Sequence, residues 1–123
     1  MKHALLVFLG GGLGSTLRYL LGKYINSQTA ILPWGTFAAN ILGCFIIGIL
    51  FGWALKSITF PETTLLFLAT GFCGGFTTFS AFAYENQLFL KTGDFTSFFV
   101  YTVASILLGL LAVIAGMWLV KVV

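Results

Sequence analysis

Long apolar stretches alternate with short polar breaks along the chain, and this pattern occurs four times. A helix that crosses the hydrocarbon core of a bilayer needs about 20 mostly apolar residues. Four stretches meet this requirement, and each is predicted to form a membrane-spanning helix: residues 4–24, 32–55, 63–90 and 95–120. The connections are short and turn-forming, namely Asn26-Ser27 before Pro33, then residues 57–61 and 91–94. The pattern therefore predicts one all-α membrane domain over residues 1–123.

The composition agrees with this fold class, because 59% of the residues are hydrophobic and only 7% are charged. Soluble domains carry far more charge, and disordered chains contain few apolar residues. The first apolar run continues to about Leu21 without a small-residue cleavage pattern, so we interpret it as a retained helix. Cys44 and Cys73 lie in separate spans without ligand spacing, and we interpret both as buried small apolar residues.

The basic residues do not favour either side of the membrane. With four spans, one side carries Lys2, Lys56 and Lys121, and the other carries Arg18, Lys23 and Lys91, which is three against three. An excess of Lys and Arg normally sets the orientation. Two interpretations follow: one loop or the first helix decides the orientation alone, or the chain inserts both ways and pairs with an inverted copy of itself.

Sets of small residues spaced four positions apart occur in three of the spans, which predicts close helix packing. They are Gly10 and Gly14, then Gly35, Ala39, Gly43, Gly48 and Gly52, then Ala112 and Gly116.

The third span contains glycines and hydroxyl residues where plain Leu and Val would cross the bilayer at less cost. The segment runs Gly71-Phe-Cys-Gly-Gly-Phe-Thr-Thr-Phe-Ser-Ala-Phe82. Irregular backbone survives in hydrocarbon only when it is buried in protein or lines a watery path. We therefore predict a site at this depth.

The side chains available to this site suit a small anion. Phe79 and Phe82 stand three apart and share a helix face, and an aromatic ring is positive around its edge. Asn40 in the second span makes an interhelical hydrogen bond or lines a pore as a donor. Hydroxyl groups complete the set, from Thr77, Thr78 and Ser80 in the third span and from Tyr101 and Ser105 in the fourth.

Ionisable residues near the spans allow several roles. The Arg18 side chain either extends to the membrane–water interface or caps a vestibule. Glu85 pairs with a basic residue, binds a cation or lines an entrance. Glu62 and Asp94 are expected at helix starts. Because the sequence has no triad, carboxylate pair, metal-ligand cluster or phosphate loop, we expect neither an enzyme nor a nucleic-acid partner.

Three motifs together resemble the CrcB/Fluc family of fluoride channels over essentially the whole chain. They are Gly11-Gly12-x-Gly14-x-x-x-Arg18-Tyr19, Gly35-Thr36-x-x-x-Asn40-x-x-Gly43 and the segment from Gly71 to Phe82, which is highly specific. The resemblance implies a passive channel in a prokaryotic plasma (inner) membrane, surrounded by lipid, that exports fluoride and relieves fluoride toxicity. It further implies a third helix broken at mid-membrane and an antiparallel, dual-topology homodimer with a sodium ion at the interface.

The resemblance also implies roles for individual residues. Phe79 and Phe82 match the phenylalanines whose ring edges contact fluoride, and Asn40 matches the pore asparagine. The other matched positions are the polar track of Thr78, Ser80, Tyr101 and Ser105, the sodium-binding carbonyls of Gly74 and Thr77, and the vestibule residues Arg18 and Glu85. Gly109 and Ala81 depart from the family pattern, since some relatives carry hydroxyl residues there.

Two other hypotheses belong to different classes. A small multidrug-type, proton-coupled exporter shares four short spans and dual topology, but it normally needs a mid-membrane carboxylate in the first span. No acidic residue precedes Glu62. A non-transporting assembly factor would leave the buried polar residues unexplained.

Overall fold

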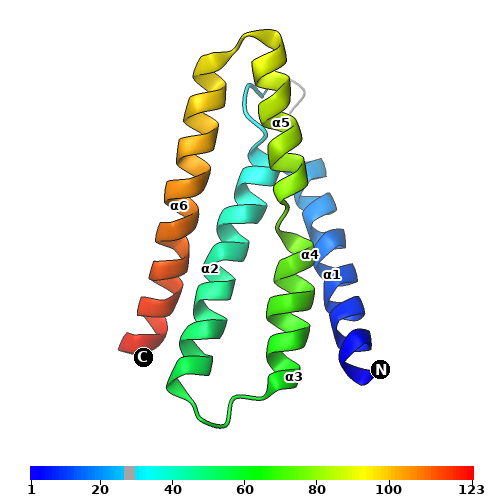
Figure 1. Ribbon diagram of the computed structural model, residues 1–123, viewed down its shortest axis with the longest axis vertical. Helices are drawn as coiled ribbons and strands as arrows, with labels where there is room; N and C mark the ends of the chain where they lie inside the picture. Colours follow the sequence, from blue (N-terminus) through cyan, green and yellow to red (C-terminus); the bar gives the residue numbers. More distant parts are fainter. Residues whose placement is uncertain (27–29) are drawn as a thin grey trace.

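The computed structural model describes residues 1–26 and 30–123, and all regular structure in these ranges is helical. Four helical segments are long and apolar enough to cross a membrane (Figure 1): Lys2–Ile25, Trp34–Lys56, Glu62–Thr92 and Phe95–Val122. The four predicted spans are therefore confirmed, with ends that differ by two residues at most. The expected turn at Asn26-Ser27 falls partly on residues 27–29, which lie outside the described residues.

Three of the spans are single helices, whereas the third is a composite. The single helices are α1 (Lys2–Ile25), α2 (Trp34–Lys56) and α6 (Phe95–Val122). The third span begins as α3 (Glu62–Leu65), continues as a π-helical stretch, η1 (Leu66–Cys73), and returns to α-helix in α4 (Gly74–Phe76) before α5 (Phe79–Thr92). Stretches of π-helix are rare and often occur next to functional sites.

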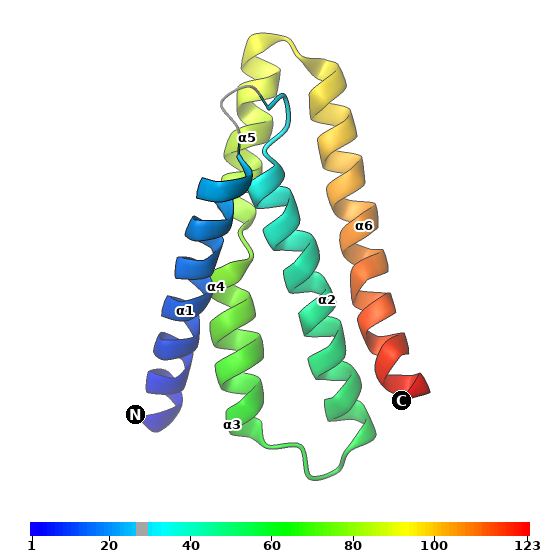
Figure 2. The same cartoon turned by 180° about the vertical axis from the view of Figure 1, so that it is seen from behind.

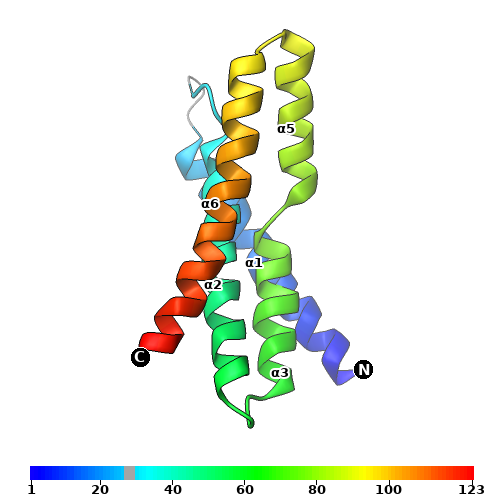
Figure 3. The same cartoon turned by 60° about the vertical axis from the view of Figure 1, so that its left-hand side comes forward.

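The third span is broken between α4 and α5, as predicted. Thr77 and Thr78 are extended, with φ/ψ of −83°/158° and −152°/121°. The helix restarts at Phe79, and the Thr78 side chain caps the new helix by accepting a hydrogen bond from the Ala81 N–H at 3.2 Å. Figure 3 shows that the linker displaces α5 sideways relative to α4, and that α5 runs beside the upper part of α6.

Consecutive spans run in opposite directions, so the two chain termini lie at the same end of the bundle (Figures 1 and 2). Helix α6 packs along α2, while α1 packs along η1 and α4. The helix ends put Lys2, Lys56 and Lys121 at one end of the bundle and Lys23 and Lys91 at the other. The assignment of these charges to two sides is thus consistent with the fold.

Glycines form the closest contacts between helices. A Cβ added at Gly14 would collide with the Phe72 carbonyl oxygen, and one added at Gly48 would collide with that of Val113. At Gly116 the collision would be with the Phe45 carbonyl oxygen. The predicted close packing through small residues is therefore confirmed along both the α1–η1 and the α2–α6 contacts.

Candidate functional site at the break in the third span

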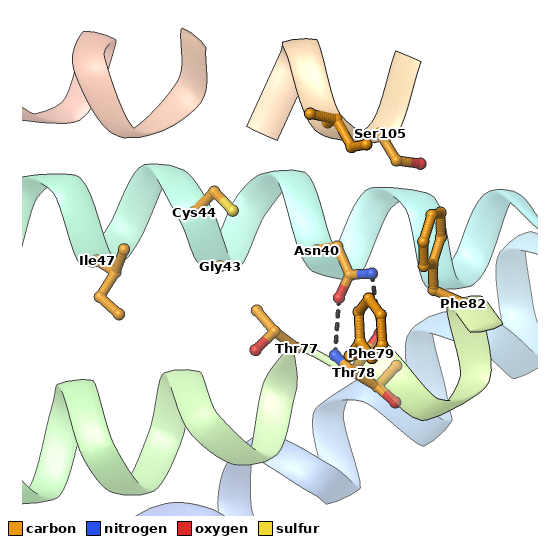
Figure 4. Close-up of a pocket in the computed structure, with 10 residues that line it drawn as sticks. Asn40, Gly43, Cys44, Ile47, Thr77, Thr78, Phe79, Phe82 and Ser105 are labelled. Atoms are coloured by element: carbon orange, nitrogen blue, oxygen red, sulfur yellow. Dashed lines mark hydrogen bonds between the residues drawn. The ribbon is translucent and has the colours of Figure 1, made fainter. Parts of the chain in front are cut away.

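Asn40 in α2 holds the broken backbone of the third span. Its Oδ1 accepts a hydrogen bond from the Thr78 N–H at 2.7 Å, and its Nδ2 donates to the Thr78 carbonyl oxygen at 3.1 Å (Figure 4). The Thr78 N–H would otherwise lack a partner, because the helix is interrupted before it, whereas the Thr78 carbonyl already begins the hydrogen-bond ladder of α5 as its N-cap. Nδ2 carries two hydrogens, so one N–H of Asn40 remains for a further acceptor.

Helix α1 supplies a second support for the break. The Arg18 Nε–H donates to the Gly75 carbonyl oxygen at 3.1 Å, and the Ser15 hydroxyl donates to the same oxygen at 3.3 Å. In a continuous helix this carbonyl would accept from the backbone N–H four residues later. A cation at the carboxyl end of a helix is also favoured by the helix dipole. Arg18 therefore lies against the break and not at the end of the bundle.

A pocket of about 320 Å³ opens beside the break, between α2, α5 and α6. Among the described residues it is lined by Asn40, Gly43, Cys44, Ile47, Thr77, Thr78, Phe79, Phe82, Ser105 and Ile106 (Figure 4). The rings of Phe79 and Phe82 lie 5.8 Å apart at 44° to each other. Both rings line the pocket, and an aromatic ring is positive around its edge.

Ser105 contributes a hydroxyl group to this pocket that has no partner within the described chain. Its Oγ is buried and is the one side-chain oxygen or nitrogen in that condition among the described residues. An unpaired buried hydroxyl costs free energy, so Ser105 Oγ marks a position where a guest molecule or ion would gain a hydrogen bond.

A second polar cluster lies next to the pocket. Both carboxylate oxygens of Glu85 accept hydrogen bonds, one from the Thr36 hydroxyl at 2.6 Å and one from the Tyr101 hydroxyl at 2.7 Å. Tyr101 is fully buried, and its ring packs on Phe82 with centroids 5.2 Å apart. Glu85 also lines a separate pocket of about 240 Å³ with Leu32 and Phe89. Phe82 therefore connects the Ser105 pocket to the Glu85 cluster.

The structure brings most of the predicted pore residues together, but not all of them. Asn40, Thr78, Phe79, Phe82 and Ser105 line one pocket, together with Thr77. The other predicted residues lie outside that pocket. Ser80 is exposed, with its Oγ 3.2 Å from Thr78 Oγ1, and Gly74 is exposed as well. Tyr101 lies behind Phe82, and Arg18 and Glu85 occupy the positions described above.

Two further polar residues near the site were not predicted from the sequence, although the position of each contains a clue to its role. Thr36 precedes Asn40 by four residues, so it shares a face of α2 with Asn40 and reaches Glu85. Asn86 is a buried amide in a membrane span, and such residues are rarely without a function. It bonds to Thr102 of the neighbouring helix α6.

Four spans, one of them interrupted beside a buried polar pocket, define a multi-pass helical membrane protein of the channel or transporter class. The sequence identifies the family within this broad class. Residues 5–117 match the family described as CrcB-like protein, Camphor Resistance (CrcB). The chain belongs to the CrcB family.

Relatives extend along nearly the whole chain. A protein named fluoride-specific ion channel FluC in Phocaeicola vulgatus is 50% identical over 120 residues, covering 97% of this chain and 98% of the relative. The protein of that name in Gloeothece citriformis is 51% identical over 122 residues, covering 98% of each chain. In Leptospira interrogans the identity is 41% over 121 residues, covering 98% of this chain and 95% of the relative.

The family and the spans confirm three expectations from the sequence. The chain is a multi-pass membrane protein of a prokaryote. Its family is one of ion channels, and it is not a family of enzymes. Each of the three relatives is named as a channel, and none of the three is named as a drug exporter.

Proposed function

We propose that this chain is a fluoride-specific channel, through which fluoride leaves the cytoplasm passively. The observation that carries the proposal is the pocket at the break, which is lined by Phe79, Phe82 and Asn40 and by Ser105, whose buried hydroxyl has no partner within the described chain. These groups are all uncharged donors or positive ring edges. The names of the relatives supply the identity of the ion.

The physical character of the pocket supports conduction and not tight trapping. Fluoride is small and strongly hydrated, so a site must replace several water contacts at once. A hydroxyl, an amide N–H and aromatic edges supply such contacts, and no Lys or Arg is among the described residues that line the pocket. A fixed cation would hold the ion, whereas weak serial sites let it move on.

The route that we propose runs from the Ser105 pocket past Phe82 to the Tyr101 and Glu85 cluster. Thr78 and Ser80 provide hydroxyls at the start of α5, and their oxygens are 3.2 Å apart. The pocket beside Glu85 would serve as one vestibule, because it lies beyond Phe82. Arg18 would make the surroundings of the break more positive, from its position on the Gly75 carbonyl.

We propose further that two copies pair in opposite orientations. Phe79 lines the pocket and yet is 78% exposed in one chain, and Gly74 and Ser80 beside it are exposed as well. Exposed polar groups at the depth of the break would be costly against lipid. A second copy would cover them, and the equal charge count on the two sides allows either orientation.

A sodium ion between the two copies is supported by the carbonyl groups at the break. The carbonyl groups of Gly74 and Thr77 lie in the last turn of α4 and in the extended linker after it, where the helical hydrogen-bond pattern stops. Carbonyl oxygens suit hard cations, so the donor set fits the ion, and an inverted copy would double the set. The ion would supply a fixed positive charge that stabilises the dimer. Replacement of sodium by N-methylglucamine should then lower the melting temperature of the purified protein.

The test of the central proposal is fluoride efflux from liposomes that contain the purified protein, followed with a fluoride electrode. We expect rapid, valinomycin-dependent release of fluoride, and no release of chloride from chloride-loaded vesicles followed with a chloride electrode. Phe82→Ile should reduce fluoride release sharply while the oligomeric state is unchanged. Absence of fluoride release from folded wild-type protein would refute the channel, and full release by Phe82→Ile would refute the role of the ring edge.

A further inference from the structure

Asn86 and Thr102 form a buried hydrogen-bonded pair that the proposed pore does not use. Asn86 in α5 is 7% exposed, and its Oδ1 accepts a hydrogen bond from the Thr102 hydroxyl of α6 at 2.9 Å. Its Nδ2 donates to the carbonyl oxygen of Phe82, one turn earlier, at 3.0 Å. The amide of Asn86 therefore joins helix α6 to the backbone of the residue whose ring lines the pocket.

This pair lies directly beside another pair between the same helices. Tyr101 donates to Glu85, and the next residue of each helix makes the next bond, from Thr102 to Asn86. Successive residues of a helix point about 100° apart, because a turn contains 3.6 residues. The two bonds consequently hold α5 from two directions, and together they fix its rotation about its own axis.

Rotation of α5 sets the direction of the Phe82 ring. α5 lies beside the upper part of α6 in all three views of the molecule (Figures 1–3), but α6 packs mainly along α2. The break before Phe79 also removes the helical hydrogen bonds that would otherwise fix α5 relative to α4. With these supports absent, polar bonds to α6 have a large share in orienting the first turns of α5.

We infer that Asn86 and Thr102 are positioning residues that hold the Phe82 ring at the angle needed to select fluoride over larger anions. The inference rests on the proposed function for its reference to fluoride, but the orientation of the ring can be tested without ion flux. The two residues touch the pocket through Phe82 and do not line it themselves.

The experiment compares Thr102→Val with Thr102→Ser. Valine has nearly the shape of threonine but leaves Asn86 Oδ1 unpaired, whereas serine retains the hydroxyl. Thr16→Val is the matched control, since within the described residues the Thr16 hydroxyl bonds only to the Gly12 carbonyl of its own helix, at 2.8 Å. We expect the ratio of fluoride to chloride efflux to fall about tenfold in Thr102→Val. The ratio should be unchanged in Thr102→Ser and in Thr16→Val.

A second measurement reports on the ring directly. With 4-fluorophenylalanine at position 82, the ¹⁹F NMR spectrum of the purified protein should show one narrow resonance, in the parent and in Thr102→Ser. In Thr102→Val it should be shifted or split. An identical spectrum in all three proteins would overturn the positioning role, whether or not the protein conducts. If the wild type releases no fluoride but the resonance responds as expected, the channel proposal fails and the positioning role stands.

Discussion

Asn40 uses both ends of its amide on one backbone position of another helix. This arrangement resembles the pairing of two strands, and it lets an extended residue, Thr78, exist inside a membrane span with its N–H and carbonyl groups satisfied. The two interpretations of Asn40 from the sequence are therefore compatible. It makes an interhelical hydrogen bond, and its remaining N–H belongs to a residue that lines the pocket.

We predict that Asn40→Asp abolishes most of the fluoride flux. The substitution keeps the oxygen that accepts from the Thr78 N–H, but it replaces the NH₂ donor by an oxygen that faces the Thr78 carbonyl oxygen. It also places a negative charge on the lining of an anion pocket. Liposome efflux should fall about 100-fold or more.

Asn26→Asp is the matched control for this substitution. The Asn26 side chain accepts a hydrogen bond from the Gly35 N–H through Oδ1 at 2.7 Å, and the carboxylate retains that oxygen. Asn26 lines the pocket beside Glu85, so its new charge would face the proposed vestibule, and flux through Asn26→Asp should fall by much less than flux through Asn40→Asp. Equal losses in the two variants would show that an added charge, and not the lost donor at Thr78, is responsible.

Among the helices, the contact between α2 and α6 distinguishes two glycines of the same helix. A Cβ at Gly116 would collide with the Phe45 carbonyl oxygen, whereas a Cβ at Gly109 would meet the Cys44 Sγ at 3.6 Å, an ordinary contact distance. The absence of a hydroxyl at Gly109 is thus not imposed by packing. The space beside Gly109 would accept a serine, whose hydroxyl would extend the polar track.

We predict that Gly109→Ser is tolerated and Gly116→Ser is not. Thermal unfolding in detergent should show Gly109→Ser within about 1 kcal/mol of the wild type, while Gly116→Ser should lose about 1–3 kcal/mol from overpacking. Both variants add the same side chain to α6, so they control for each other. A larger loss for Gly109→Ser than for Gly116→Ser would contradict the observed packing of α6 on α2.

The turn between α5 and α6 is built by two residues with different tasks. Gly93 has a φ of 77°, in the left-handed region that favours glycine, and α5 ends there. Asp94 then caps α6, and its side chain accepts from the Ser97 N–H at 3.0 Å. Hydrogen bonds from the side chain and backbone of Ser97 hold the pKa of Asp94 below its ordinary value.

This lowered pKa predicts a pH-dependent contribution to stability. A carboxylate with a lower pKa in the folded state stabilises the fold above its unfolded pKa and loses that effect as the pH falls through the folded pKa. Asparagine also caps helices but does not titrate. The wild type should therefore melt at a higher temperature than Asp94→Asn at pH 6, and the difference should vanish well below about pH 4. A constant difference across this range would contradict the prediction.

For the molecule as a whole, the sequence allowed the spans and the break to be predicted, but not the partners at the break. Spans follow from local hydropathy, and the segment from Gly71 to Phe82 indicates a weak helix by its composition and by its family resemblance. The bonds from Arg18 to Gly75 and from Asn40 to Thr78 join residues 57 and 38 positions apart. Such pairs depend on how the helices pack, which no local pattern encodes. The π-helical stretch η1 likewise gave no recognisable signal.

The near-equal numbers of basic residues on the two sides of the bundle predict complementation between oppositely biased variants. Lys23→Gln with Lys91→Gln leaves more basic residues at the end that carries both termini, and Lys2→Gln with Lys121→Gln does the reverse. Each double variant should insert in one orientation, so each alone should fail to protect a fluoride-sensitive bacterium. Coexpression of the two should restore fluoride resistance. Full resistance from either variant alone would argue against an inverted pair.

The supports of the break also bear on how the protein is made. Ser15 and Arg18 belong to α1 and Asn40 belongs to α2. Among the described residues, every side chain from another helix that bonds to the backbone of Gly75 and Thr78 therefore precedes them in the chain. A chain synthesised from its amino terminus delivers α1 and α2 to the membrane before the third span emerges from the ribosome. The partners of the broken helix are then already present when it enters the bilayer, and its unpaired backbone groups need not wait in lipid for a segment still to be translated.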